Sequence, residues 1–481
     1  MLPNLPFDPS HCLIDGTWRA TNATLPLINP STGETLCNIA RSFEDDVNAA
    51  VIAARSALED TWGRMTALER GRCLTRLGQL VLDNADLLTT LEALDVGKPL
   101  SQAHADAVAL ARYCEFYGGA ADKLHGQTIP YLDGYTVYTL REPHGVTGHI
   151  VPWNYPMQII GRSVGAALAM GNACVLKPAE DACLTALIFA HLAKEAGFPD
   201  GALNVIPGLG SEAGAALARH SGIQHLSFTG SVRTGKAIQI AAAANVVPVT
   251  LELGGKSPQI VFADADLDAA LPFLVNAGLQ NAGQTCSAAS RILIQQNVYD
   301  EVADRMADAY RAKTIAPACD DPDIGPLISI RQKERLETTL RAAQDLTCIA
   351  RTPMPQNLPE GGAYVQPRLY GPTPPDHPLA QDELFGPVQV LIPFDTETDA
   401  LEIANGTEYG LVAGVWTQDG ARQMRLAKAL RSGQVFLNNY GAGGGVELPF
   451  GGVGKSGHGR EKGFEALYGF STLKTVAARH G

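Results

Sequence analysis

The sequence predicts an α/β fold, and two stretches of the chain carry most of that prediction. Between residues 146 and 262, short apolar runs alternate with segments of helical periodicity. This alternation is typical of an open parallel sheet covered by helices on both faces. A second region of the same kind follows over residues 265 to 450. The 481 residues are enough for two or three domains with large cores.

The N-terminal part is predicted to contain short strands and then helices. Residues 13 to 40 read as strands joined by glycine-containing turns. Helical patterns follow over about 67 to 95 and 101 to 124. Strict alternation from 131 to 141 then predicts a paired strand, a ribbon of the kind that serves contacts between subunits.

The first α/β region is predicted to contribute a series of strands with helices between them. The apolar runs are 146–151, 173–176, 203–206, 225–228, 247–253 and 259–262. Ligands of open α/β sheets bind beyond the carboxyl ends of the strands. Polar residues that directly follow these runs are therefore the first candidates for a functional site.

Composition excludes several classes of function. The net charge of -13 leaves no basic excess for a nucleic-acid partner. Nine cysteines, an odd number without paired metal-ligand spacing, argue against a disulfide framework and against a metal site. No signal peptide and no bilayer-length apolar segment are evident. We expect a cytoplasmic protein that binds neither membrane nor metal.

One cysteine, Cys286, lies in a run of small and polar residues at 281–287, after an apolar, helix-like stretch. Small neighbours leave its sulfur approachable, and Gly283 lets the backbone turn toward it. The alternative is a buried structural thiol, because free cysteines are among the most buried residues. Cys286 is the candidate nucleophile among the nine.

Two glycine-containing turns between a strand and a helix are candidates for phosphate binding. The turn at 208–213 has the GxGxxA pattern but no acidic residue at the expected distance. The turn at 228–236 contains Gly230, which permits close approach of the backbone, and Ser231. The amides of a helix N-terminus favour anions. An ordinary capped helix is the alternative for the second turn.

Polar residues follow two further predicted strands. Asn154 stands between two prolines, which fix the turn, so its amide is a candidate donor to an oxyanion. Lys177 and Glu180 follow the next strand, where they could hold ribose hydroxyls. A side-chain-stabilised turn and solvated charges are the respective alternatives.

Two carboxylates complete the set of candidates. Glu252 is flanked by Leu251 and Leu253, so burial would raise its pKa and suit it to act as a general base near neutral pH. Its alternative is an edge-strand glutamate that faces water. Glu383 precedes Phe385 and a Gly-Pro turn, and its alternative is a surface turn.

In their order along the chain, these motifs resemble the NAD(P)-dependent aldehyde dehydrogenase superfamily over essentially the whole length. The matching motifs are PWN (152–154), KPAE (177–180), FTGS (228–231), LELGGKSP (251–258), GQTC (283–286), ELFGPV (383–388) and PFGG (449–452). The resemblance implies two α/β domains, one Rossmann-like for the cofactor and one carrying the catalytic thiol, with a small oligomerisation ribbon. The implied segments are 1–123 and 144–254 for NAD binding, 255–453 for catalysis, and 124–143 and 454–481 for oligomerisation.

The resemblance implies oxidation of an aldehyde to its carboxylic acid through a thioester, as in the hydrolytic members of the superfamily. Cys286 would attack the aldehyde carbon and form a thiohemiacetal. Asn154 and the Cys286 backbone N–H would hold the oxyanion. Glu252 would activate the water that hydrolyses the thioester. Lys177 is also predicted to be one of the catalytic residues.

The implied cofactor is NAD. Its predicted ligands are Trp153, Lys177, Glu180, Gly230, Ser231, Glu383 and Phe385. Glu180 would bind two hydroxyls of the adenosine ribose and repel a 2′-phosphate, which predicts a preference for NAD over NADP. Glu383 resembles the nicotinamide-ribose ligand. The GxGxxA turn is expected to lie off the cofactor path.

The predicted substrate contacts are Arg162, Gln280, Thr285, Ser287 and Phe450. Arginine at 162 resembles succinic-semialdehyde-type enzymes, in which it meets the substrate carboxylate, although Gln280 stands where those enzymes tend to have a second arginine. The alternative for Arg162 is a helix-face arginine paired with a carboxylate. The loop 438–446 has little bulk. We expect a polar or acid-bearing semialdehyde first and a bulky aromatic aldehyde second.

Three other functions are weighed against this interpretation. An aldehyde dehydrogenase that acylates coenzyme A typically lacks the general base, and Glu252 is present. A non-catalytic binding protein on the same fold would lose Cys286 or Asn154. A cofactor-free thiol hydrolase needs a histidine base, and only His225 and His458 lie near a motif. The resemblance also implies a homodimer or homotetramer.

Overall fold

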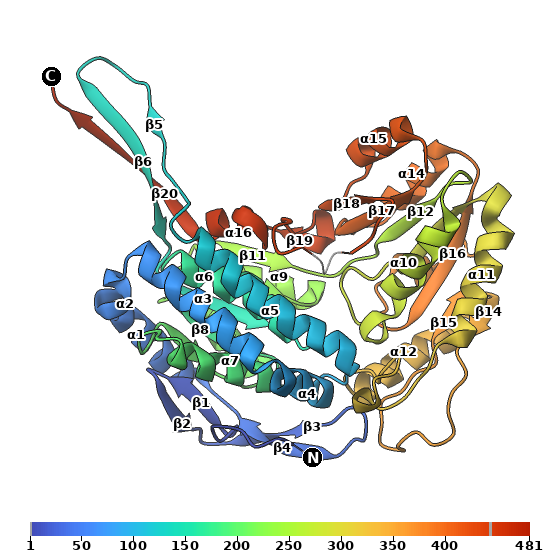
Figure 1. The fold of residues 1–481 in the computed structure, drawn as a ribbon, viewed down its shortest axis with the longest axis horizontal. Coiled ribbons are helices and arrows are strands. Elements are labelled where there is room, and N and C mark those ends of the chain that lie inside the picture. Colours follow the sequence, from blue (N-terminus) through green and yellow to red (C-terminus); the bar gives the residue numbers. More distant parts are fainter. Residues whose placement is uncertain (1, 442–444) are drawn as a thin grey trace.

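The computed structural model describes residues 2–441 and 445–481, which form two α/β lobes and a projecting ribbon (Figure 1). Each lobe is built around its own sheet. The two sheets match the two α/β regions that the alternation of apolar runs and helices predicts.

The first sheet has eight strands in the order β19-β11-β10-β7-β8-β9-β1-β2. Its strands are β1 (His11–Ile14), β2 (Thr17–Ala20), β7 (Val146–Val151), β8 (Ala173–Pro178), β9 (Leu203–Val205), β10 (His225–Thr229), β11 (Val249–Glu252) and β19 (Gly457–His458). Strands β7 to β11 run parallel. Their carboxyl ends therefore share one edge of the sheet, where a ligand is expected.

Two groups of helices pack against this sheet. The helices of the first lobe are α1 (Glu44–Glu59), α2 (Thr61–Arg64), α3 (Ala67–Asp83), α4 (Ala85–Asp95), α5 (Leu100–Ala120), α6 (Pro156–Ala169), α7 (Leu184–Glu195), α8 (Ala215–Arg219) and α9 (Val232–Ala243). Helices α6 and α7 contact each other and the central strands, with α3 and α5 behind them. Helices α1, α8 and α9 form the second group.

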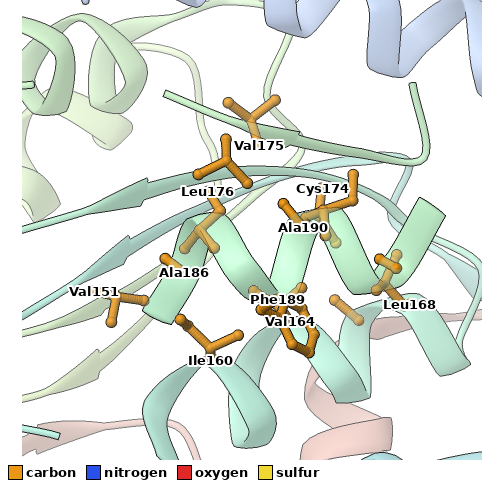
Figure 2. Close-up of a cluster of buried hydrophobic side chains, with 14 of the residues drawn as sticks. Val151, Ile160, Val164, Leu168, Cys174, Val175, Leu176, Ala186, Phe189 and Ala190 are labelled. Carbon is orange, nitrogen blue, oxygen red and sulfur yellow. The ribbon is translucent and has the colours of Figure 1, made fainter. Parts of the chain in front are cut away.

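The core of this lobe lies between α6, α7 and β8 (Figure 2). Ile160, Val164 and Leu168 recur every four residues and so form one apolar stripe on α6. They lie near Phe189 of α7 and Leu176 of β8 (Figure 2). Complete burial of such a side chain is worth about 1.5–3 kcal/mol. This packing fixes the two strand ends, at 151 and 178, that precede Asn154 and Glu180.

The second sheet has seven strands in the order β14-β15-β16-β13-β12-β17-β18, and all except β14 run parallel. Its strands are β12 (Pro258–Val261), β13 (Arg291–Gln295), β14 (Cys348–Arg351), β15 (Arg368–Tyr370), β16 (Val388–Phe394), β17 (Val412–Trp416) and β18 (Gln434–Leu437). Its helices are α10 (Leu267–Leu279), α11 (Tyr299–Ala312), α12 (Ile330–Ala342), α13 (Pro378–Gln381), α14 (Glu397–Asn405) and α15 (Gly420–Ala429). The apolar run at 259–262, expected in the first region, thus belongs to the second sheet, because β12 pairs with β13 and β17.

A three-stranded sheet of order β20-β6-β5 projects away from both lobes, with the C-terminus at its tip (Figure 1). It contains β5 (Thr128–Ile129), β6 (Tyr135–Pro143) and β20 (Ser471–Arg479). The segment 454–481, expected to serve oligomerisation, divides between three places. Strand β19 joins the first sheet, α16 (Gly463–Gly469) packs beside α6, and only β20 enters the ribbon.

The remaining elements are short. Strands β3 (Thr24–Ile28) and β4 (Thr35–Ala40) form a hairpin. A π-helix spans Gly210–Gly214, and 3-10 turns span Gln280–Gly283, Gln296–Val298, Ala318–Asp320 and Gly454–Ser456. Within the described ranges, no helix is long and apolar enough to cross a bilayer. The same ranges hold no cluster of three or more His, Cys, Asp or Glu side chains placed to bind a metal.

Candidate active site

A cavity of about 1210 Å³ is lined by residues of both lobes, and it collects every site residue predicted from the sequence. The residues Asn154, Trp153, Arg162, Lys177, Glu180, Gly230, Ser231 and Glu252 come from the first lobe. The second lobe contributes Gln280, Thr285, Cys286, Ser287, Glu383, Phe385 and Phe450. Segments far apart in the sequence therefore meet around one space.

The loop that carries Cys286 turns through a left-handed backbone. Asn281 and Ala282 have φ values of 48° and 52°, a conformation that costs an alanine about 1–2 kcal/mol. The buried side chain of Gln284 holds this turn in place. Its Nε2 donates to the carbonyl of Asn281 at 3.0 Å, and its Oε1 accepts from the N–H of Ile328 at 2.9 Å. The loop thus holds Cys286 at the cavity.

Asn154 is tied to the same loop. Its Nδ2 donates to the carbonyl of Gln284 at 3.0 Å. Its own carbonyl accepts from Nδ2 of Asn281 at 2.9 Å. These two bonds tie Asn154 to Asn281 and Gln284 of the Cys286 loop, so its buried side-chain amide is held at the cavity.

Two adjacent glycines let the strand end β11 approach both sides of the site. A Cβ on Gly254 would lie 2.3 Å from Oε2 of Glu383, and a Cβ on Gly255 would lie 2.2 Å from the carbonyl of Cys286. Both distances are far below van der Waals contact. The backbone N–H of Gly255 also donates to Oε1 of Glu383 at 2.9 Å. The two glycines of the LELGGKSP motif therefore allow the Glu383 carboxylate and the Cys286 loop to approach the end of the same strand closely.

Burial favours the thiol form of Cys286. Burial raises the pKa of Cys286 to about 12, and the guanidinium of Arg162 is the largest opposing influence. The thiolate is the reactive form of cysteine. Positive charge near the sulfur therefore decides how much thiolate exists at a given pH.

Glu252 is 1% exposed, so it is not an edge-strand glutamate facing water. Neither carboxyl oxygen has a hydrogen-bond partner among residues 2–441 and 445–481. Burial raises the pKa of Glu252 well above its usual value, while the Arg162 guanidinium pulls it down. The neutral form of this carboxyl is therefore favoured, because burying the charge without a hydrogen-bond partner is costly.

Arg162 is paired with a carboxylate, which is the alternative that the sequence left open. Its guanidinium forms a buried ion pair with Glu461 and donates from Nη2 to Oγ1 of Thr229 at 3.3 Å. It also lies over the ring of Phe450, 4.9 Å from the ring centroid. Arg162 lines the cavity, but its charge is compensated by the protein itself.

The other half of the cavity holds the predicted cofactor ligands. Lys177 and Glu180 form an ion pair at 3.0 Å. Ser231 caps α9 by accepting from the N–H of Thr234 at 3.3 Å. Burial raises the pKa of Glu383 to about 7, although the Gly255 N–H opposes this shift.

This donor set fits a dinucleotide. Carboxylates stand at two places, Glu180 and Glu383, as ribose hydroxyls require, and the N-terminus of α9 lies at the cavity wall to accept a pyrophosphate. The rings of Trp153 and Phe385 meet edge to face with centroids 5.4 Å apart. The GxGxxA turn does not line the cavity. Its Gly210 backbone instead supports Glu180 by a hydrogen bond that lowers the pKa of this carboxyl.

The predicted substrate contacts also line the cavity. Thr285 Oγ1 and Ser287 Oγ are 3.2 Å apart, and the Tyr440 hydroxyl donates to the carbonyl of Ser287 at 2.6 Å. Phe450 is almost fully buried and faces the Arg162 guanidinium. Residues 442–444 of the loop 438–446 lie outside the described residues.

Three residues of the site had no role in the sequence-based prediction. Gln284 holds the nucleophile loop, Glu461 compensates Arg162, and Lys462 lines the cavity. Gln284 lies inside the GQTC motif, so its position next to the nucleophile could have suggested a structural role in this loop. Glu461 and Lys462 follow Arg460 in a charged stretch of the tail that carried no local signal.

Comparison with known proteins identifies the family. The model of the aldehyde dehydrogenase family matches residues 18–476. Human retinal dehydrogenase 2 is 39% identical over 99% of this chain and 93% of its own length. Mitochondrial aldehyde dehydrogenase family 2 member B4 of Arabidopsis thaliana is 40% identical over 98% of this chain and 89% of its own length.

Solved structures agree with these relatives. A Burkholderia cenocepacia protein, solved as an aldehyde dehydrogenase candidate, is 61% identical, covers 98% of this chain and 100% of its own, and superposes with a TM-score of 0.97. An NAD+ complex of aldehyde dehydrogenase from Bacillus cereus is 38% identical over 98% of this chain and 96% of its own, with a TM-score of 0.95. The predicted two-lobed α/β fold is confirmed by these superpositions. The chain belongs to the aldehyde dehydrogenase family, and the predicted enzyme class, an NAD-dependent aldehyde dehydrogenase, is confirmed.

Proposed function

We propose that this enzyme oxidises a polar or acid-bearing semialdehyde to its carboxylic acid, with a thioester on Cys286 as the intermediate. The observation that carries this proposal is the meeting of Cys286, Asn154 and Glu252 around one cavity that also holds a dinucleotide-type donor set. A nucleophile, an oxyanion donor and a base in one pocket are what acyl transfer requires.

Cys286 begins the reaction. Its sulfur, once deprotonated, forms a C–S bond to the aldehyde carbon, and the carbonyl oxygen becomes an oxyanion. The amide of Asn154 and the Cys286 N–H stabilise that charge, and the loss of one such donor costs about 3–4 kcal/mol. NAD, held by the residues named below, would supply the hydride acceptor that this adduct needs to become a thioester.

Glu252 completes the reaction. Once deprotonated, its carboxylate removes a proton from a water molecule, whose oxygen attacks the thioester carbon and displaces the Cys286 thiolate, and Glu252 then releases that proton to solvent. The carboxylic acid leaves, and the thiolate is ready for another aldehyde. The buried position of Glu252 supports this role, because a base with a raised pKa is strong enough to activate water.

We propose that Lys177, Glu180, Ser231 with Gly230, and Glu383 hold NAD, with Trp153 and Phe385 at the nicotinamide end, and that NAD is preferred over NADP. The Glu180 carboxylate would repel a 2′-phosphate and bind the two hydroxyls of NAD instead. We expect Glu180→Gln to raise the ratio of kcat/KM for NADP to that for NAD by about 10-fold or more. Asp181→Asn removes the adjacent carboxylate, which does not line the cavity, and serves as the matched control. A ratio unchanged in Glu180→Gln would refute this assignment.

A second substrate class is favoured by the outer part of the cavity. Val108 and Phe273 line it and are 42% and 40% exposed, so the entrance is partly apolar. One relative carries the name retinal dehydrogenase 2, which suits a bulky apolar aldehyde. A bulky aromatic aldehyde is therefore the second candidate. The cytoplasmic location stays a prediction that cell fractionation can check.

The test is NADH formation with a panel of semialdehydes, aromatic aldehydes and simple alkyl aldehydes. We expect turnover with wild-type enzyme and none with Cys286→Ala. Addition of coenzyme A should leave the rate unchanged and produce no acyl-CoA, because the thioester is resolved by water. Dehydrogenase activity in Cys286→Ala would refute the role of this thiol.

A further inference from the structure

Gln102 is a half-buried residue in the first turn of α5, and it lines the same cavity as Cys286. Its Oε1 accepts from the N–H of Asn281 at 2.8 Å, and its Nε2 donates to the carbonyl of Asp323 at 3.4 Å. The two bonds require the same orientation of the amide, with oxygen toward Asn281 and nitrogen toward Asp323. Both partners lie in the second lobe, so Gln102 bridges the first lobe and the loop that carries Cys286.

The turn that Gln102 contacts is held against its intrinsic preference. Asn281, Ala282 and Gly283 have successive φ values of 48°, 52° and 72°. A glycine adopts this left-handed backbone freely, whereas Ala282 does so at an energetic cost. Contacts from outside the turn therefore decide how fully this conformation is populated. Asn281 is 1% exposed, so the N–H that Gln102 accepts from is in a buried residue, where a donor without an acceptor is costly.

Helix α5 is a firm support for this bond because it packs into the first lobe. It contacts α3, α4 and α6, and Ala107 and Leu110 belong to its buried face. Helix α6 begins two residues after Asn154, which also bonds to the Cys286 loop. The first lobe therefore holds this loop at two points, Gln102 and Asn154. Because the same lobe carries the proposed ligands of the adenosine ribose, the two points set where the sulfur lies relative to the cofactor.

We propose that Gln102 is a positioning residue for the nucleophile. Its side-chain carbonyl holds the Asn281 N–H and thereby keeps the Cys286 sulfur in the place that hydride transfer to the cofactor needs. This inference rests on the proposed role of Cys286 and extends it to a residue of the other lobe. Gln102 acts through the loop and takes part in no bond-making step.

Replacement of Gln102 by leucine tests the proposal, because leucine keeps similar bulk but accepts no hydrogen bond. With the best aldehyde of the panel, Gln102→Leu should lower kcat/KM by about 5- to 100-fold, the loss expected when a buried donor has no acceptor. KM for NAD should change by less than about 3-fold, because the cofactor ligands stay in place. Gln102→Glu keeps an acceptor oxygen and should retain most of the activity. A kcat/KM in Gln102→Leu equal to wild type, or an equal fall in Gln102→Glu, overturns the proposal.

The preceding residue of the same helix turn provides the matched control. Ser101 is exposed, and its backbone N–H donates to Oδ1 of Asp321 at 2.7 Å. Ser101→Ala keeps that bond and should change kcat/KM by less than about 2-fold, as expected for a surface substitution. An equal fall in Ser101→Ala and Gln102→Leu would mean that the start of α5 acts only as general support, and would overturn the proposal.

Hydrogen–deuterium exchange separates this inference from the proposed reaction, because it needs no turnover. A peptide that covers residues 276–288 should exchange at least about 5-fold faster in Gln102→Leu than in wild type, and at the wild-type rate in Gln102→Glu and Ser101→Ala. Unchanged exchange in Gln102→Leu, or faster exchange with unchanged kcat/KM, overturns the positioning role and leaves the proposed reaction standing. If Cys286→Ala still forms NADH, the proposed nucleophile is wrong and its positioning fails with it, whatever the exchange of the loop.

Discussion

At the scale of single residues, the main feature of the site is the positive charge of Arg162, which Glu461 compensates. Arg162 is buried with Glu461 and lies over Phe450, so it acts on Cys286 and Glu252 through its field. Burial disfavours the anion of both groups and raises the pKa of each. The reactive form of each is the deprotonated one, and Arg162 favours it in both cases.

A pH dependence follows from these two shifts. Below a raised pKa, the deprotonated fraction grows about 10-fold per pH unit, so kcat/KM should rise between about pH 6 and about pH 9. Replacement of Arg162 by Met removes the charge that lowers both pKa values and should displace the profile to higher pH. Lys at position 162 keeps the charge and is the control. A flat profile, or a displacement to lower pH in Arg162→Met, would contradict this account of the site.

At the scale of elements, the strand end β11 and its two glycines set the spacing of the site. Each glycine faces one functional group, Gly254 the Glu383 carboxylate and Gly255 the Cys286 backbone. A methyl group at Gly254 would displace the Glu383 carboxylate, and one at Gly255 would displace the Cys286 carbonyl. The consequences should differ, because one group is proposed to bind cofactor and the other to carry the reaction.

We expect Gly254→Ala to raise KM for NAD and Gly255→Ala to lower kcat, each by about 100-fold, the effect of an error of about 1 Å in a catalytic group. Gly420→Ala, at a position with open space around it, is the control for glycine replacement. Steady-state kinetics on all three variants, with melting curves to verify folding, make the comparison. The same effect on both parameters in the first two variants would mean that β11 acts only as general support.

The elements also show where sequence-based prediction succeeds and fails. Runs such as 146–151 and 225–228 were found because apolar periodicity is local. The pairing of β6 with β20 was not found, and periodicity alone did not place β12 in the second sheet, because both depend on contacts between distant segments. The fifteen predicted site residues were found because they lie in or near local motifs. Glu461 and Lys462 were missed because only contacts between distant segments bring them to the site. Their partners, Arg162 and Phe450, lie elsewhere in the chain, and no local pattern marks such contacts.

At the scale of the whole molecule, the ribbon of β5, β6 and β20 projects away from the two lobes (Figure 1). Leu140 of β6 and Leu473 of β20 are 40% and 56% exposed, and β20 is an edge strand of its sheet. An exposed edge strand favours pairing with another chain. The division into NAD-binding, catalytic and oligomerisation segments stays a prediction, and the homodimer or homotetramer does so too.

Light scattering on the purified enzyme tests the role of the ribbon. We expect the mass of a dimer or tetramer for wild type and a smaller assembly for the double variant Leu140→Glu, Leu473→Glu, because charges replace the apolar surface. Met424→Glu, on α15 and away from the ribbon in Figure 1, is a control of similar exposure. A monomeric wild-type enzyme would refute oligomerisation, and an unchanged mass in the double variant would refute the role of this ribbon.

The division of labour between Cys286 and Glu252 is the central claim, and Glu252→Gln tests it most directly. The variant should release one NADH per active site and then stop, because the amide cannot activate water. Intact-mass spectrometry should then show the acyl group added to the protein, with no addition in a Cys286→Ala, Glu252→Gln double variant. Continued turnover of Glu252→Gln at the wild-type rate, without a covalent adduct, would contradict the proposed mechanism.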